Sequence, residues 1–242
     1  MNIDDFLKRH AAGEQSFPEI NLAEACLREA NLVSTNLSKA NLSKSDLREA
    51  RLGQANLSFA NLSQANLSET ILWGTNLSHA NLSHADLREA DLTGAKLIKA
   101  NLEETELIKA CLCGCDLGGA VLSKALLVEA DFRPNYEQHT NLSEAILSGA
   151  NLSYANLSGV ILQRANLDGV KLCRAILGSF KNNKFYQADL SEASLQGADL
   201  SYADLTGVNL SKANLQGADL SKTILAGANL QGAIMPDGTI RD

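Results

Sequence analysis

The chain has 242 residues and a formal net charge of −7, and 45% of its residues are hydrophobic although only 5% are aromatic. A globular core of this size ordinarily contains more aromatic side chains, so we expect a narrow, uniform core built mainly from Leu and Ala. The acidic balance disfavours non-specific nucleic-acid binding, and the absence of any apolar run long enough to span a bilayer excludes a membrane segment.

The first segment predicts a short helix. Residues 2–12 place apolar side chains at Ile3, Phe6, Leu7 and Ala11, which is a helical spacing, and Gly13 follows as a C-cap. We expect residues 1–13 to form an N-terminal capping helix over the first turn of the repeats that come next. Docking of a partner is the alternative role for this helix.

Residues 17–235 form one run of five-residue repeats. Leu recurs every fifth residue from Leu22, a small residue lies two positions before it, and Asn or Asp usually comes just before it. Of 41 central positions 39 are Leu, so the unit is A-(N/D)-L-x-x. Repeats of this kind predict one elongated domain in which neighbouring units bury a shared core.

A period of five fits neither an α-helix nor a flat strand. On a helix, successive Leu residues would lie about 140° apart, and on a strand they would point to opposite faces. A chain that turns a corner in every unit brings all Leu side chains into one core. The small residue then also faces inward, and the other three positions face water.

Two segments interrupt the repeats, and a short tail follows them. The first interruption covers residues 133–139; the repeat phase survives it, so we expect it to replace one unit with a bulged loop. The second covers residues 178–187 and shifts the phase by three residues. Each is either a tolerated insertion at a corner or a recognition loop on a rigid scaffold. Residues 236–242 are expected to close the other end as a turn and tail.

The Ala-Asn-Leu-Ser-x and Ala-Asp-Leu-x-x units resemble the pentapeptide-repeat proteins over residues 17–235. The resemblance implies an all-β fold, a right-handed quadrilateral β-helix (a pentapeptide-repeat solenoid) with four units per coil. With strand-like stacking of about 4.8 Å, ten or so coils give a rod of roughly 50 Å.

With four units per coil, residues 20 apart stack on one face. One face then carries Arg48 and Arg88 together with Arg28 in a ladder of mixed charge, which is either solvated or a docking stripe. The next face exposes Ile71 and the single Trp of the chain, Trp73, as candidate binding anchors. The remaining partner-binding candidates project from neighbouring faces or lie in the first interruption: Phe59, Ile98, Ile108, Arg133, Asn135 and Tyr136.

No constellation of residues predicts catalysis. Cys111 and Cys113 are expected to point outward and Cys115 inward, so the three thiols cannot converge on a metal ion. No Ser has a His and a carboxylate arranged beside it, and no phosphate-binding motif occurs. We therefore expect no enzyme activity, no cofactor and no metal. The five cysteines and the lack of a targeting segment predict a cytoplasmic protein with reduced thiols.

Several segments outside the repeat consensus resemble one cyanobacterial member of the family. The resemblance implies a regulator of heterocyst differentiation that binds the HetR transcription regulator and relieves inhibition by a pattern-forming peptide with an RGSGR motif. The alternatives are a DNA mimic that binds a type II topoisomerase (gyrase), which predicts strongly acidic faces, and a structural rod that self-associates. We expect a monomer or weak homodimer. The segments are His10–Gly13, Ile71–Gly74, Gly94–Leu97, Leu107–Ala110, Arg133–Thr140, Leu172–Ala175 and Gly232–Gly238.

Overall fold

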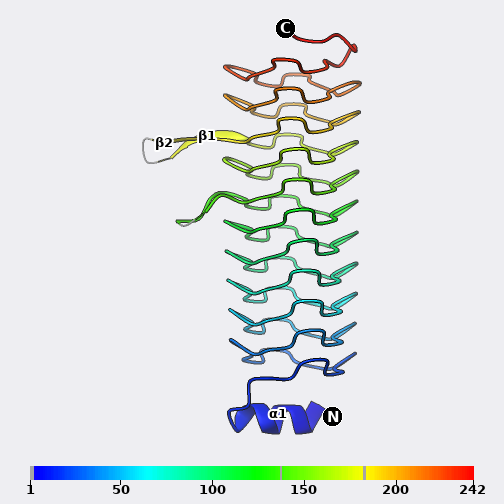
Figure 1. The fold of residues 1–242 in the computed structure, drawn as a ribbon, viewed down its shortest axis with the longest axis vertical. Helices are drawn as coiled ribbons and strands as arrows, with labels where there is room; N and C mark the ends of the chain where they lie inside the picture. Colours follow the sequence, from blue (N-terminus) through cyan, green and yellow to red (C-terminus); the bar gives the residue numbers. More distant parts are fainter. Residues whose placement is uncertain (1–2, 137, 182–183) are drawn as a thin grey trace.

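The protein is a rod of stacked coils with a helix at one end (Figure 1). The structure, a computed structural model, describes residues 3–136, 138–181 and 184–242. Parts of three predicted segments lie outside the described residues: residues 1–2 of the capping helix, Glu137 of the first interruption and residues 182–183 of the second.

Except where the two interruptions begin, each five-residue unit turns one corner through a β-turn. In the unit around Leu42, the Ser45 N–H donates to the Leu42 carbonyl at 3.2 Å, and Lys44 at the third turn position has φ of +57°. The backbone also bonds to the next coil, since Leu42 N donates to Asn61 O at 2.7 Å and Lys44 N to Ser63 O at 2.9 Å. A regular corner of this kind is therefore bonded both within its own turn and to the next coil.

The Asn or Asp that usually precedes the central Leu stabilises this turn. Asn41 Oδ1 accepts the backbone N–H of Ser43 at 3.2 Å, which is the side-chain turn that Asn and Asp favour. The same side chains also bond between coils, as in Asn56 Nδ2 to Asn36 Oδ1 at 3.3 Å. These two kinds of hydrogen bond explain why Asn and Asp are preferred at the position before the central Leu.

The coil register explains both interruptions. Paired residues of adjacent coils lie 20 apart, as in Asn21↔Asn41, so four units complete one coil. The step becomes 25 at Asp116↔Asn141 and 28 at Ile161↔Asp189. The prediction that the first interruption replaces a unit is wrong, because its coil keeps all four sides and the five extra residues form an added loop.

The core is a column of Leu side chains with small residues beside them. From Leu22 to Leu215, the central side chains are at most 3% exposed, and Phe132 fills its slot in the same way. Buried hydroxyls in the small slot bond to a carbonyl, as in Thr70 Oγ1 to Leu47 O at 2.9 Å. The expected narrow core of Leu and Ala is present.

Helix α1 (Ile3–Ala11) lies across the first coil. Its Phe6 is fully buried and meets Phe17 edge-on, with ring centroids 4.7 Å apart. Gly13 ends the helix with φ of +95°, and the bonds Gly13 N to His10 O and Glu14 N to Arg9 O form a Schellman cap.

The second interruption is a β-hairpin that projects from the rod. Strands β1 (Gly178–Lys181) and β2 (Lys184–Gln187) pair antiparallel, with Gly178 opposite Gln187. At the far end of the rod, the tail bends back and Ile240 pairs antiparallel with Ile234 of the last unit. The tail leaves Leu220, Leu225 and Leu230 of the last coil only partly buried.

Candidate interaction surface

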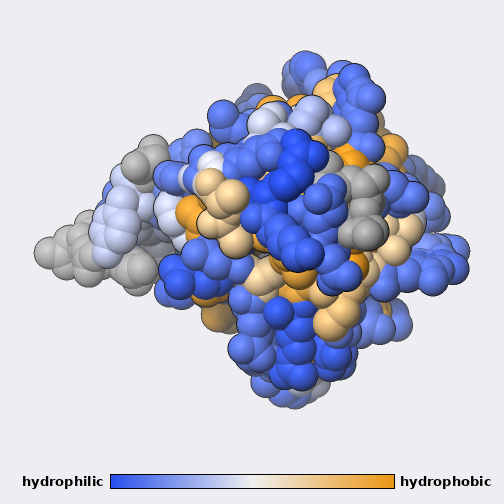
Figure 2. All heavy atoms as spheres, turned by 90° about the horizontal axis from the view of Figure 1, so that it is seen from below, coloured by the Kyte–Doolittle hydropathy of each residue, from blue (hydrophilic) through white to orange (hydrophobic). Residues whose placement is uncertain are grey.

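Both interruptions leave the rod from the same face, which we call the loop face: the face whose central residues include Leu52, Leu72, Leu92, Leu112, Phe132, Leu157 and Leu177. Figure 1 shows the loop and the hairpin extending to the same side. Viewed from the helix end, hydrophilic residues dominate the visible surface, and apolar residues gather in small patches (Figure 2). Of the sequence-predicted candidates, five belong to the loop face: Ile71, Trp73, Arg133, Asn135 and Tyr136.

Trp73 lies flat along the loop face rather than standing away from it. Its side chain is 41% exposed, and a Cβ placed on Gly53 of the previous coil would lie 2.6 Å from the indole Nε1. Gly53 therefore makes room for the indole ring. Ile71, two residues earlier, is half-buried, so the anchor at this height is mainly the exposed part of Trp73.

The first loop folds down onto glycines of the coils on either side. Asn135 packs against Gly114, where a Cβ would lie 2.3 Å from the Asn135 Cγ, and Gln138 Nε2 donates to the Gly114 carbonyl. On the other side, His139 Nδ1 bonds to Gly159 O at 2.7 Å. These contacts hold the loop and present Tyr136 at its tip, fully exposed.

Arg133 begins the loop and is tied to its own unit. Its guanidinium donates to both carboxylate oxygens of Asp131, at 2.9 Å and 2.6 Å. Burial raises the pKa of Asp131, but the Arg133 side chain and backbone N–H lower it more, so the pKa lies below its usual value. The pair is half-exposed, and it fixes the direction in which the loop leaves the face.

The hairpin and the loop enclose a groove on this face. Tyr186 of β2 approaches His139, with ring centroids 6.2 Å apart, so the two interruptions touch. Phe185 of the hairpin packs against Gly207 of the next coil. The groove between the interruptions has a volume of about 440 Å³, and its lining includes Thr93, Cys111, Cys113, Arg133, Tyr136 and Tyr186.

The predicted arginine stripe lies on an adjacent face and is internally paired. Arg48 and Arg88 each donate to the Asp two residues earlier, at 2.5 Å in both cases, and Arg28 bonds to Glu49 at 2.7 Å. Because the guanidinium donates these hydrogen bonds to the Asp86 carboxylate, the pKa of Arg88 is raised. All three guanidiniums are partly exposed, so these are surface ion pairs that contribute little to stability.

The other apolar candidates do not join the loop face. Phe59 and Ile98 lie on the face of Leu57 and Leu97, and Ile108 lies on the arginine face. Phe59 is 59% exposed and stacks on His79 of the next coil at 4.7 Å, whereas Ile98 and Ile108 are half-buried. The structure therefore divides the candidates among three faces rather than bringing them together.

A ladder of aromatic and cationic side chains on the arginine face was missed by sequence reasoning. The Arg174 guanidinium lies 5.7 Å from the Tyr154 ring centroid and 5.5 Å from that of Tyr202, and Lys222 continues the ladder 4.9 Å from the Tyr202 centroid. These residues occupy the same unit position in successive coils. A constant spacing of 20 residues does not reveal the alignment in the sequence, because the hairpin lengthens the step between these coils to 28 residues.

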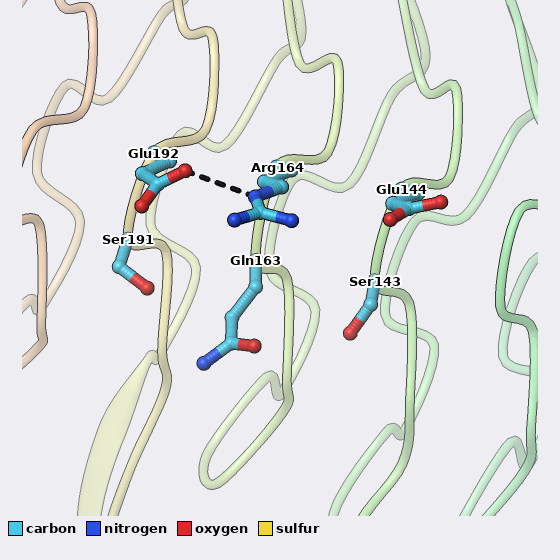
Figure 3. Close-up of a pocket in the computed structure, with 6 residues that line it drawn as sticks. All are labelled: Ser143, Glu144, Gln163, Arg164, Ser191 and Glu192. Carbon is cyan, nitrogen blue, oxygen red and sulfur yellow. Dashed lines mark hydrogen bonds and ion pairs between the residues drawn. The ribbon is translucent and has the colours of Figure 1, made fainter.

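A smaller polar depression, of about 280 Å³, lies on the face of Leu142 and Leu162 (Figure 3). Arg164 Nε donates to Glu192 Oε2 at 2.9 Å across it. This hydrogen bond raises the pKa of Arg164 and lowers that of Glu192. The cation that lines the depression is thus already neutralised by a neighbouring coil.

The cysteines lie where the unit positions predict. Cys111 and Cys113 are half-buried on the loop face, and Cys115 is buried, with its Sγ donating to Leu92 O at 2.9 Å. In the part of the chain that the structure describes, no group of three or more His, Cys, Asp or Glu could hold a metal ion. Among the same residues, no helix is both long and apolar enough to cross a membrane.

Comparison with known families settles what kind of repeat this is. The pentapeptide-repeat family matches over residues 17–54, 55–94, 85–123, 138–178, 179–211 and 203–237. The chain is a pentapeptide-repeat protein. A comparison with curated proteins gives no significant match.

Three solved structures are similar to it. HetL from the cyanobacterium Nostoc sp. strain PCC 7120, a protein involved in heterocyst differentiation regulation, is 54% identical over 100% of both chains, with a TM-score of 0.80. A second protein from Nostoc PCC 7120 is 36% identical, covering 43% of this chain and 80% of its own, with a TM-score of 0.32. Full-length QnrB1, a plasmid-mediated fluoroquinolone resistance protein, is 18% identical, covering 88% and 92%, with a TM-score of 0.27.

The likeness to HetL confirms the resemblance to a cyanobacterial member inferred from the sequence. It extends over the whole chain, including the segments where the repeat does not dictate the residues. Family membership and this likeness imply a right-handed β-helix and a repeat scaffold.

Proposed function

We propose that this pentapeptide-repeat protein is a non-enzymatic regulator of heterocyst differentiation that binds a HetR-type transcription regulator. The full-length likeness to HetL, at 54% identity, is the observation that carries the proposal. In this mechanism the rod covers the peptide-receiving part of the regulator. It thereby relieves inhibition by a peptide with an RGSGR motif.

The loop face is the surface that we assign to the regulator. It combines the exposed indole of Trp73, a loop held by contacts to two other coils, and the fully exposed Tyr136 at the loop tip. Aromatic anchors on a rigid surface are typical of binding hot spots, because little conformational entropy is lost when they are covered. The groove beside the loop offers a place for a side chain of the partner.

The charge distribution supports a protein scaffold over DNA mimicry. The net charge is −7, and several carboxylates along the rod are paired with cations, as in Arg28–Glu49, Lys39–Glu19 and Lys124–Glu104. A mimic of duplex DNA requires continuous unpaired negative charge. The topoisomerase alternative therefore lacks a specific observation in its favour.

Binding to the purified HetR-type regulator tests the proposal. We expect wild type to bind, and we expect Trp73→Ala and deletion of residues 134–138 each to weaken binding at least tenfold, about 1.4 kcal/mol. Leu7→Ala serves as a matched control, because Leu7 is also 41% exposed but lies on α1 away from the loop face. Melting curves must show that each variant remains folded.

A labelled RGSGR peptide supplies the second readout. If the rod covers the peptide-receiving surface, added wild-type protein displaces the peptide from the regulator, and Trp73→Ala displaces it less. Undiminished peptide binding in a formed complex would contradict the competition mechanism while leaving the interaction intact. No binding by folded wild type would refute the proposed function, and a gyrase supercoiling assay would then test the alternative.

A further inference from the structure

Two thiols lie side by side in the groove of the loop face. Leu112 points into the core, and residues on either side of an inward side chain in extended chain point the other way, so Cys111 and Cys113 both face the groove. Cys111 Sγ lies 3.2 Å from the Thr93 hydroxyl, and Cys113 Sγ donates to the Asp131 carbonyl at 3.7 Å.

This spacing permits a disulfide bond between them. Two residues of extended chain span about 6.6 Å, which is inside the roughly 4.4–6.8 Å of Cα separation that disulfides show. Gly114 follows with φ of +65°, so the chain bends immediately after the second cysteine. Cys115 points inward instead, and its thiol is held by the Leu92 carbonyl in the core.

The two thiols are electrostatically unequal. The neighbouring Cys113 thiol and the Thr93 hydroxyl lower the pKa of Cys111 to about 6, although burial opposes this shift. The pKa of Cys113 is raised by the neighbouring Cys111 thiol and by burial. Cys111 is therefore the more acidic thiol of the pair, and Cys113 holds its proton more firmly. A nucleophilic thiol and its resolving partner divide these roles in the same way.

We propose that Cys111 and Cys113 form a reversible dithiol–disulfide site that responds to hydroperoxides. The Cys111 thiolate attacks a peroxide oxygen, which gives the sulfenic acid at Cys111 and releases hydroxide when the oxidant is hydrogen peroxide. The Cys113 sulfur then attacks the Cys111 sulfur, the disulfide forms, and water leaves with the Cys113 proton. An external dithiol reverses the reaction through a mixed disulfide and is itself oxidised.

The site is coupled to the loop through Gly114. Its N–H donates to Thr140 Oγ1 at 2.8 Å, its carbonyl accepts from Gln138 Nε2, and its Cα supports the Asn135 side chain. Drawing Cys113 toward Cys111 moves the residue on which the loop rests. Oxidation is therefore expected to loosen the loop and weaken partner binding; this regulatory role rests on the proposed function, whereas the thiol chemistry does not.

Thiol mapping of the whole chain tests the chemistry. Reduced protein is treated with one equivalent of hydrogen peroxide, alkylated with iodoacetamide and digested with trypsin, which yields residues 110–124 as one peptide. We expect this peptide to lose two alkylatable thiols and two hydrogens, while Cys173 stays fully alkylated. Cys111→Ser should slow the oxidation at least tenfold, and Cys113→Ser should stop it at a sulfenic acid that dimedone traps.

Cys115→Ala separates this pair from the neighbouring thiol. Ala is the commonest residue in the small slot, so the variant should fold and form the same disulfide. A disulfide that requires Cys115, or alkylation of Cys111 at pH 6.5 no faster than that of Cys173, would overturn the proposal.

Hydrogen exchange separates the site from the proposed function. In the disulfide form we expect the Gly114 amide and residues 138–140 to exchange at least tenfold faster than in the reduced form. Unchanged exchange with a formed disulfide would overturn the coupling to the loop. If exchange changes but neither form binds the regulator, the redox site stands and the proposed function fails.

Discussion

At the scale of single residues, the repeat depends on a backbone conformation that most side chains avoid. The third turn position has φ near +60° in unit after unit, and Glu, Lys, Gln and even Phe59 and Tyr154 occupy it. A non-glycine residue in this left-handed region loses about 1 kcal/mol. Interlocking hydrogen bonds offset the cost, since the N–H of this residue donates to the next coil. Since other residues tolerate this conformation, glycine is required at such a position only where a neighbouring atom leaves no room for a Cβ, as at Gly114.

Gly114 and Gly169 form a matched pair for measuring how firmly the loop is docked. Both have φ near +65°, but a Cβ on Gly114 would lie 2.3 Å from Asn135, whereas a Cβ on Gly169 would meet nothing within 4 Å. We expect Gly169→Ala to cost about 1 kcal/mol from backbone strain alone. Gly114→Ala should cost more and should free the loop.

Chemical denaturation and exchange at residues 138–140 check this prediction. A larger loss of unfolding free energy in Gly114→Ala, together with faster loop exchange, is the expected result. Equal losses in the two variants, with unchanged loop exchange, would mean that Asn135 does not rest firmly on Gly114.

At the scale of elements, helix α1 closes an end that would otherwise expose the core. Phe6 is fully buried against Phe17, and His10 Nε2 lies 3.0 Å from the Thr35 hydroxyl of the first coil. Solenoids need such caps because the end units have a neighbour on one side only. Leu7 was predicted to share the apolar side of the helix, yet it is 41% exposed, so one aromatic residue provides most of the anchoring.

Phe6→Ala should detach the helix while leaving the coils folded. Losing a buried Phe costs about 3–5 kcal/mol, and a nine-residue helix is not stable in water without its tertiary contacts. We expect loss of helical circular dichroism and faster exchange in the first coil, with Leu7→Ala close to wild type. Retained helicity in Phe6→Ala would show that the His10 contact and the Gly13 cap suffice.

The sequence predicts regular elements of this protein better than its irregular ones. The five-residue period identifies the inward Leu and small residues, and it places Cys115 inside and Cys111 outside, as observed. The path of a loop has no such period. Nothing in the sequence around Asn135 indicates that it rests on Gly114, 21 positions earlier, because that contact depends on the loop being added to a four-sided coil.

At the scale of the whole molecule, the four-sided coil places on different faces several residues that the sequence analysis considered together as candidates for one binding surface. Trp73 and Arg133 share the loop face because they lie three steps of 20 apart, whereas Phe59 and Ile108 fall on the two flanking faces. The rod makes each face a separate surface, since a flat partner can cover one side without reaching the next. A binding site on this scaffold is therefore expected to run along one face and to span several coils.

The two ends of the rod are unequal, and this predicts where unfolding begins. Helix α1 covers the first coil, but Leu220, Leu225 and Leu230 of the last coil remain partly exposed and Ile224 is 50% exposed. Each coil is stabilised mainly by its neighbours, so opening should start at the C-terminal coil and progress inward. We expect amides such as Leu210 N, which donates to Asn229 O, to exchange at least tenfold faster than Leu87 N.

Two substitutions distinguish fraying from unfolding in a single step. Leu225→Ala removes a half-buried side chain from the last coil, so it should speed exchange there and leave Leu87 N unchanged. Leu87→Ala removes a fully buried side chain from the middle, costs about 2–5 kcal/mol, and should speed exchange throughout the central coils. Equal acceleration at both ends of the rod by Leu225→Ala would mean that the coils open as one cooperative unit, because then no coil could be lost without the others.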